Sequence, residues 1–225
     1  GVAALFGDGP VVLGRAGMGK TVLLRKVLAD MAADAERYET AVIASPSPAW
    51  TGFLLLESLL DRLHRTPNVR SYDAWMEALN RYLLEDPDRV RILLIDDAQN
   101  LGKPSALEVL RLTQNLETPQ RKLLNLVLFG QLEWAESLRA APGLTGRASV
   151  VYILPPFSYE DTRRMVEFRL RQAGATEGGP RFSEESLRLA HEYAEGVPGA
   201  VVTLCRNALA VAARLGQREI GREIL

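Results

Sequence analysis

Short, almost wholly apolar segments recur along the first part of the chain, separated by longer amphipathic segments. The apolar segments are 11–13, 40–44, 91–95, 124–129 and 149–154. Such continuous apolar runs are typical of parallel strands that are covered on both faces. The segments between them, 20–35, 50–65, 71–85, 105–116 and 132–140, space their apolar residues as helices do. We therefore predict an α/β fold with a five-stranded, doubly wound parallel sheet and right-handed crossovers.

The pattern changes after Leu154, where Pro155 and Pro156 interrupt the chain. From there on only helical periodicity is found, over 159–172, 183–194 and 199–215. Ser158 and Ser183 stand where helix N-caps are expected. The sequence thus predicts two domains, an α/β core over 1–155 and a small all-helical lid over 156–225.

Composition narrows the class of protein. The 225 residues carry a net charge of −1, which argues against an overall basic protein that coats nucleic acid. One cysteine excludes an internal disulfide, and the two histidines have no metal-ligand spacing. No apolar run approaches the roughly 20 residues of a membrane span, and no signal peptide is recognised. We expect a cytoplasmic chain, and its start on Gly1 without a methionine suggests a fragment.

The first candidate site is a glycine-rich loop between the first strand and the first helix. Residues 14–21 read G-x-x-x-x-G-K-T, the phosphate-binding loop of nucleoside triphosphatases. Its backbone N–H groups and Lys20 are expected to bind phosphate oxygens, while Thr21 offers a hydroxyl to Mg²⁺. The predicted ligand is ATP or ADP with Mg²⁺. The predicted nucleotide-binding residues are Gly14, Arg15, Ala16, Gly17, Met18, Gly19, Lys20, Thr21 and Val22.

The second candidate site is a pair of carboxylates at the end of the apolar segment 91–95. We predict that Asp96 holds Mg²⁺, with Thr21, and that Asp97 polarises the attacking water. Acids at strand ends are otherwise common as loop caps. Their position beyond the phosphate loop, with a further strand in between, favours the catalytic interpretation and the additional-strand class of P-loop ATPases.

These stretches, with three others, resemble the AAA+ ATPases of the ExeA/GspA type, a group similar to the transposition ATPases TniB and TnsC. The resemblance rests on residues 14–21, DDAQNL at 96–101, FGQ at 129–131, RLRQAG at 169–174 and GVP at 196–198. It spans nearly the whole chain in the family's order. It implies an AAA+ core, ATP hydrolysis and assembly into oligomers.

The resemblance also assigns roles to single residues. Gln131 falls at the polar position that senses the γ-phosphate, although a helix-capping amide is the alternative. Arg147 matches the arginine that such ATPases present to the nucleotide of a neighbouring subunit, with Arg139 as the second choice. A guanidinium suits that role because it is always charged. Asp97, Gln131 and Arg147 are therefore the predicted catalytic residues.

Two residues depart from the family pattern. Asp97 replaces the usual glutamate, and Gly199 stands where the lid normally carries an arginine that contacts the γ-phosphate. Arg206, two helical turns beyond Gly199, is a possible substitute. We expect tight nucleotide binding and slow intrinsic turnover.

The sequence is compatible with three uses of ATP. The resemblance implies assembly of secretion or envelope machinery through a protein partner. A TniB/TnsC-type regulator that binds double-stranded DNA and a transposase is the alternative, supported by Arg163, Arg164, Arg169 and Arg171 on one helix, although a solvated face explains them too. A STAND-type signalling switch is a third possibility.

Overall fold

A computed structural model describes residues 9–86, 88–139, 150–176 and 179–225. Contacts within the chain divide it into two compact units. The first comprises residues 9–15 with Lys20–Ile153, and the second comprises Ala16–Gly19 with Leu154–Leu225. Among the described residues, no helix is long and apolar enough to cross a membrane.

The first unit is built on a five-stranded sheet in the order β2-β3-β4-β1-β5. All its pairings are parallel, with Ala41 beside Leu93, Leu93 beside Leu126 and Val11 beside Leu128. The predicted doubly wound parallel sheet is therefore confirmed. In space β4 lies between β1 and β3, so a strand separates the strand that leads into the glycine-rich loop from the strand that leads into the acid pair. The strands are β1 (Val11–Leu13), β2 (Tyr38–Ile43), β3 (Val90–Ile95), β4 (Asn125–Gly130) and β5 (Val151–Ile153).

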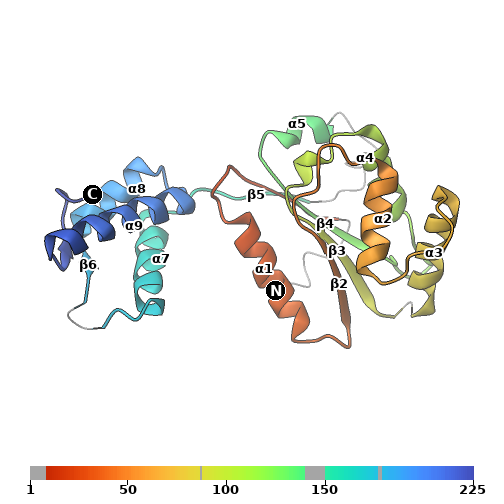
Figure 1. Cartoon of the computed structure of the whole chain (residues 1–225), viewed down its shortest axis with the longest axis horizontal. Helices are drawn as coiled ribbons and strands as arrows, with labels where there is room; N and C mark the ends of the chain where they lie inside the picture. The colour runs from red at the N-terminus through yellow and green to blue at the C-terminus, as the bar shows by residue number, and fades with distance from the viewer. Residues whose placement is uncertain (1–8, 87, 140–149, 177–178) are drawn as a thin grey trace. The chain divides into compact units, whose positions relative to one another are not determined.

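Helices cover both faces of this sheet. From β1 the chain crosses the sheet to the edge strand β2, and it then returns in the opposite direction through β3 and β4. Because the crossovers are right-handed, α1 lies on one face of the sheet and α2, α3 and α4 lie on the other (Figure 1). These helices are α1 (Lys20–Ala32), α2 (Gly52–Arg62), α3 (Tyr72–Glu85) and α4 (Pro104–Gln114), and α5 (Trp134–Arg139) and the short 3-10 helix η2 (Ala98–Asn100) complete the unit.

Strands β1 to β4 are apolar on both faces because each face packs against helices. Leu13, Ile43 and Ile95 are fully buried in the core that includes α2, α3 and α4. Successive strand residues point to opposite faces, so Leu94 and Phe129 belong to the other face; they are 0% and 1% exposed. The continuous apolar runs of β1 to β4 thus correspond to strands that are covered on both sides. β5 is an edge strand whose three residues are all exposed, so the expected coverage of that segment is wrong.

A glycine sets the distance between two of the covering helices. A Cβ on Gly52, at the start of α2, would lie 2.3 Å from the carbonyl oxygen of Ser105 and 2.7 Å from a methyl of Val109 in α4. No side chain fits at that separation. Gly52 therefore lets α2 and α4 pack closely over the sheet.

The second unit packs α7 (Tyr159–Gln172), α8 (Glu184–Tyr193) and α9 (Pro198–Leu215) around a small apolar core. Ser158 and Asp161 form a capping box that begins α7. Cys205 is buried in this core, and burial raises the pKa of its thiol to about 11. In addition to the predicted helices, a two-stranded parallel pair joins β6 (Arg181–Phe182) to β7 (Glu219–Ile220).

Candidate functional site

The glycine-rich loop leaves the carboxyl end of β1 and ends where α1 begins at Lys20. Gly17 and Gly19 have φ of +80° and +86°, a left-handed conformation that side-chain-bearing residues rarely adopt. The glycines at these two positions therefore permit the curled path of the loop. Met18, between them, is only 6% exposed.

Lys20 holds its charge inside the loop. Its Nζ donates to the carbonyl oxygen of Gly14 at 2.7 Å and to that of Arg15 at 3.1 Å. The residue is 8% exposed, which is rare for a lysine. An ammonium group fixed in this way, beside the N-terminus of a 13-residue helix, has the charge and position that suit a phosphate.

Thr21, at the start of α1, and Asp96, directly after β3, meet at the carboxyl ends of the strands. The hydroxyl of Thr21 donates to Oδ2 of Asp96 at 2.6 Å, although the residues are 75 positions apart. Oδ1 of Asp96 accepts the backbone N–H of Asp97 at 3.0 Å, and Asp96 is 5% exposed. Mg²⁺ prefers hard oxygen ligands and keeps several waters, so one hydroxyl and one carboxylate suffice as its protein ligands. The two residues predicted for Mg²⁺ therefore fit that ion.

Asp97 occupies a strained position with an oriented carboxylate. Its backbone is left-handed, with φ +51°, which is uncommon for a residue with a side chain. The hydroxyl of Ser45 donates to Oδ2 at 2.8 Å, and the amide of Gln99 donates to Oδ1 at 3.2 Å. Both oxygens of the predicted water-polarising group are thus held in place by neighbouring side chains.

Gln99 is a residue of this site for which the sequence predicts no role. Its Nε2 donates to Asp97, while its Oε1 accepts the backbone N–H of Gln131 at 3.1 Å. One amide therefore connects the loop after β3 to the end of β4. Ser45, two residues after β2, is the second such residue. A position just after a strand is the sequence signal for both, and Gln99 also falls within the DDAQNL motif.

The remaining predicted residues are located as follows. The Gln131 side chain is exposed, and its backbone rather than its amide makes the bond to Gln99. Arg147 lies outside the described residues, while Arg139, its alternative, is exposed at the end of α5. Val22, on α1, is 62% exposed.

Gly199 has a steric role within the second unit. Its N–H donates to the carbonyl oxygen of Gly17 at 2.9 Å, and a Cβ on Gly199 would lie 3.0 Å from Gly17 Cα. An arginine would therefore not fit here without a backbone shift. Arg206, the possible substitute, is exposed two turns further along α9.

Sequence comparison places these residues in a known family. The AAA domain family matches residues 9–138, more than half of the chain. General secretion pathway protein A of Aeromonas hydrophila is 34% identical over 223 residues, which is 95% of this chain and 39% of that protein. An uncharacterized HTH-type transcriptional regulator of Methanocaldococcus jannaschii is 24% identical over 63% of this chain and 35% of its own length. The chain thus spans less than two fifths of the length of each of these relatives.

Solved structures show the same fold at low sequence identity. Cdc6p of Pyrobaculum aerophilum superposes with a TM-score of 0.73 and 22% identity, over 97% of this chain and 61% of that one. The ORC2 protein of Aeropyrum pernix in its ADP form gives 0.70 and 16%, over 97% and 61%. With its glycine-rich loop, its acid pair and its strand order, the chain belongs to the AAA domain family of P-loop ATPases.

Proposed function

We propose that this chain binds Mg-ATP and hydrolyses it slowly. The observation that carries the proposal is the 2.6 Å contact between Thr21 and Asp96, next to a lysine whose amine is fixed inside the glycine-rich loop. Lys20 would bind the β- and γ-phosphates, and Thr21 and Asp96 would hold Mg²⁺, whose charge would offset that of the transferred phosphoryl group. Asp97 orients and polarises the attacking water. Because Asp97 is one methylene shorter than glutamate and Gly199 supplies no charge, turnover is expected below the ~1–10 s⁻¹ common for enzymes.

In this proposal ATP drives oligomerisation and, through it, the assembly of a larger complex in the cytoplasm. Support comes from the likeness to general secretion pathway protein A over nearly the whole chain. Arg147 would complete the nucleotide site of a neighbouring subunit. The second predicted use, a DNA-bound regulator, loses part of its support because Arg163 and Arg164 pair with glutamates of their own helix.

The proposal is tested by measuring ATP turnover per subunit across a range of protein concentrations. Shared sites predict that turnover per subunit rises with concentration and that Arg147→Ala abolishes the rise while nucleotide binding persists. Arg139→Ala tests the alternative, because this variant and not Arg147→Ala would lose the rise if the exposed end of α5 supplied the arginine. Turnover per subunit that is constant with concentration, and unchanged in Arg147→Ala, would refute catalysis by shared sites.

A further inference from the structure

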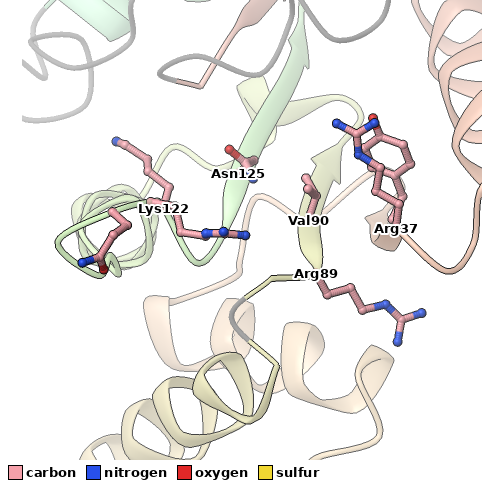
Figure 2. A pocket seen from close by; sticks show the side chains of 8 residues that line it. Arg37, Arg89, Val90, Lys122 and Asn125 are labelled. Atoms are coloured by element: carbon pink, nitrogen blue, oxygen red, sulfur yellow. The ribbon is translucent and has the colours of Figure 1, made fainter.

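The sheet of the first unit has a second concave region at the edge opposite to the glycine-rich loop. A cavity of about 450 Å³ lies where β2, β3 and β4 begin. Its lining comes from the turns that enter these three strands and includes Arg37, Tyr38, Arg89, Arg121, Lys122 and Asn125. In Figure 2, Val90 at the start of β3 lies between Asn125 of β4 and Arg37 of the turn before β2.

Positive charge dominates this cavity. Arg37, Arg89, Arg121 and Lys122 line it, while no carboxylate is among the described lining residues. Asp88 pairs with Arg121 at 2.7 Å, but both side chains are largely exposed, at 84% and 46%. Exposed pairs of this kind are weak and exchange readily with other ions. The chain as a whole has a net charge of −1, so the cluster is a local feature and not a consequence of composition.

The basic side chains differ in how they face the cavity. The guanidinium of Arg37 lies over the ring of Tyr38, 5.2 Å from its centroid. Lys122 is half-buried and donates to the carbonyl oxygen of Gln114 at 3.4 Å. The guanidinium of Arg89 points away from Lys122 (Figure 2) and donates to the carbonyl oxygen of Ala35. The side chains best placed to meet an anion are the exposed ones of Arg37 and Arg121.

The spacing of these charges indicates an extended anion. Neighbouring strands are about 4.8 Å apart, so the turns before β2 and β4 are separated by roughly 10 Å. A nucleic-acid strand repeats its negative charge along an extended backbone, so neighbouring phosphates can meet basic groups that are spread over this span. The amide nitrogen of Asn125 donates to the carbonyl oxygen of Arg91 at 3.2 Å, and its side-chain oxygen adds a hydrogen-bond acceptor to the cavity. A single small phosphate would engage only part of this set.

We propose that this cavity binds the phosphodiester backbone of a nucleic acid. β3 runs six residues from the cavity to Asp96, a distance of about 20 Å, so nucleotide and nucleic acid are bound at opposite edges of one sheet. Contacts to the backbone carry no sequence information, and the binding is therefore expected to be sequence-independent and steeply dependent on salt. The inference does not require ATP hydrolysis.

The test measures binding of a short labelled oligonucleotide, single-stranded or duplex, by fluorescence anisotropy. Saturating ADP is included so that phosphates of the oligonucleotide do not occupy the glycine-rich loop. The double variant Arg37→Gln/Arg121→Gln is expected to bind at least about tenfold more weakly, and its salt slope should fall by about one for each phosphate that is no longer neutralised. The matched control is Arg164→Gln, which removes one exposed charge from α7 and is expected to leave affinity unchanged.

Three results would overturn the proposal. The first is unchanged affinity in the double variant while ADP binding shows that it is folded. The second is an equal loss in Arg164→Gln, which would place the nucleic acid on α7. The third is displacement of the oligonucleotide by pyrophosphate at an equal concentration of phosphate groups, which would indicate a small-anion site. None of these outcomes bears on hydrolysis, because Lys20 and Asp97 are unaltered in both variants.

Discussion

In the sheet of the first unit, charged side chains are buried at the edge formed by the carboxyl ends of the strands and exposed at the edge formed by their amino ends. At the carboxyl edge Lys20 and Asp96 are 8% and 5% exposed, and each is bound by protein groups at 2.6–2.7 Å. At the amino edge Arg37 and Arg121 are exposed and lie on turns. Burying a charge is costly unless it is paired and hydrogen-bonded, so the first arrangement requires a fixed geometry and the second does not.

This difference indicates two kinds of recognition. Fixed groups suit a ligand of one shape, which on our proposal is a nucleotide with its metal ion. Exposed basic side chains suit a polymer whose charges are repeated and need no unique position. The variants below test this contrast at both edges, beginning with the largest expected effect.

Asp97→Asn is expected to lower ATP turnover by roughly 10³-fold, because the amide cannot polarise water as a carboxylate does. Nucleotide affinity should remain unchanged, since Asp97 is not among the residues proposed to bind phosphate or Mg²⁺. Steady-state hydrolysis and calorimetric binding of a non-hydrolysable ATP analogue measure the two quantities. A variant that hydrolyses ATP as fast as the parent protein would remove Asp97 from the proposed mechanism.

Lys20→Ala is expected to weaken ATP and ADP binding by about 100-fold, the effect of losing hydrogen bonds from a charged donor. Lys26→Ala is the control, since Lys26 lies on the same helix with a side chain that is 69% exposed. Fluorescent-nucleotide titration compares the two variants. If both bound nucleotide as the parent does, the phosphate site would lie elsewhere.

Arg91→Ala is expected to destabilise the protein by about 3 kcal/mol, because it removes one partner of a buried ion pair. Arg91 is 3% exposed, and its Nε donates to Glu39 at 2.9 Å; the hydroxyl of Tyr82 donates to the same carboxylate. Burial, followed by the Glu39 carboxylate, raises the pKa of Tyr82. Urea unfolding measures the loss of stability.

Arg37→Gln is the comparison for Arg91→Ala, with an expected change in unfolding free energy within about 0.5 kcal/mol. Arg37 directly precedes β2 and Arg91 lies near the start of the neighbouring strand β3, but of the two only Arg91 is buried. Similar losses of stability in both variants would show that exposed basic residues at this edge are structural.

Gln99→Leu is expected to lower turnover about tenfold without changing nucleotide affinity, because Asp97 loses one of its two side-chain partners. Gln99→Glu keeps the acceptor for the backbone of Gln131 but not the donor to Asp97. If the bond to Asp97 is what matters, both variants lose turnover. Full turnover in Gln99→Glu with reduced turnover in Gln99→Leu would assign the effect to the bond with Gln131 instead.

The elements that could be predicted are those that a single short segment of sequence specifies. Each of the five strands is a short apolar run, buried in all but the edge strand β5, and the glycine-rich loop is eight consecutive residues with a fixed chemistry. The strand ends differ from the predicted ones by at most two residues, and α1 ends at Ala32 after its last buried residue, Met31. The β6–β7 pair was not predicted because two-residue strands have no periodicity to detect.

The parts that escaped prediction depend on residues far apart in sequence. Gln99 acts through bonds to two loops, and the basic cavity gathers residues from 37 to 125. Conversely, Arg163 and Arg164 resemble a basic face in sequence, yet their charges are offset by Glu160 one turn before them on α7. The spacing of the glutamates on α7 already favoured a solvated helix face in the sequence, whereas the basic cavity could be recognised only in the folded arrangement.

The Glu39–Tyr82–Arg91 cluster has a consequence for how relatives of this chain can diverge. Its members are largely buried, and Tyr82 and Arg91 both donate hydrogen bonds to Glu39. A substitution at one position therefore leaves a buried polar group unpaired, so we expect substitutions at these positions to occur together. Positions 37 and 121 are under no such constraint and can change singly. Sequence drift can therefore alter the charge of the amino edge, and with it the choice of polyanion, while the ATPase fold is inherited unchanged.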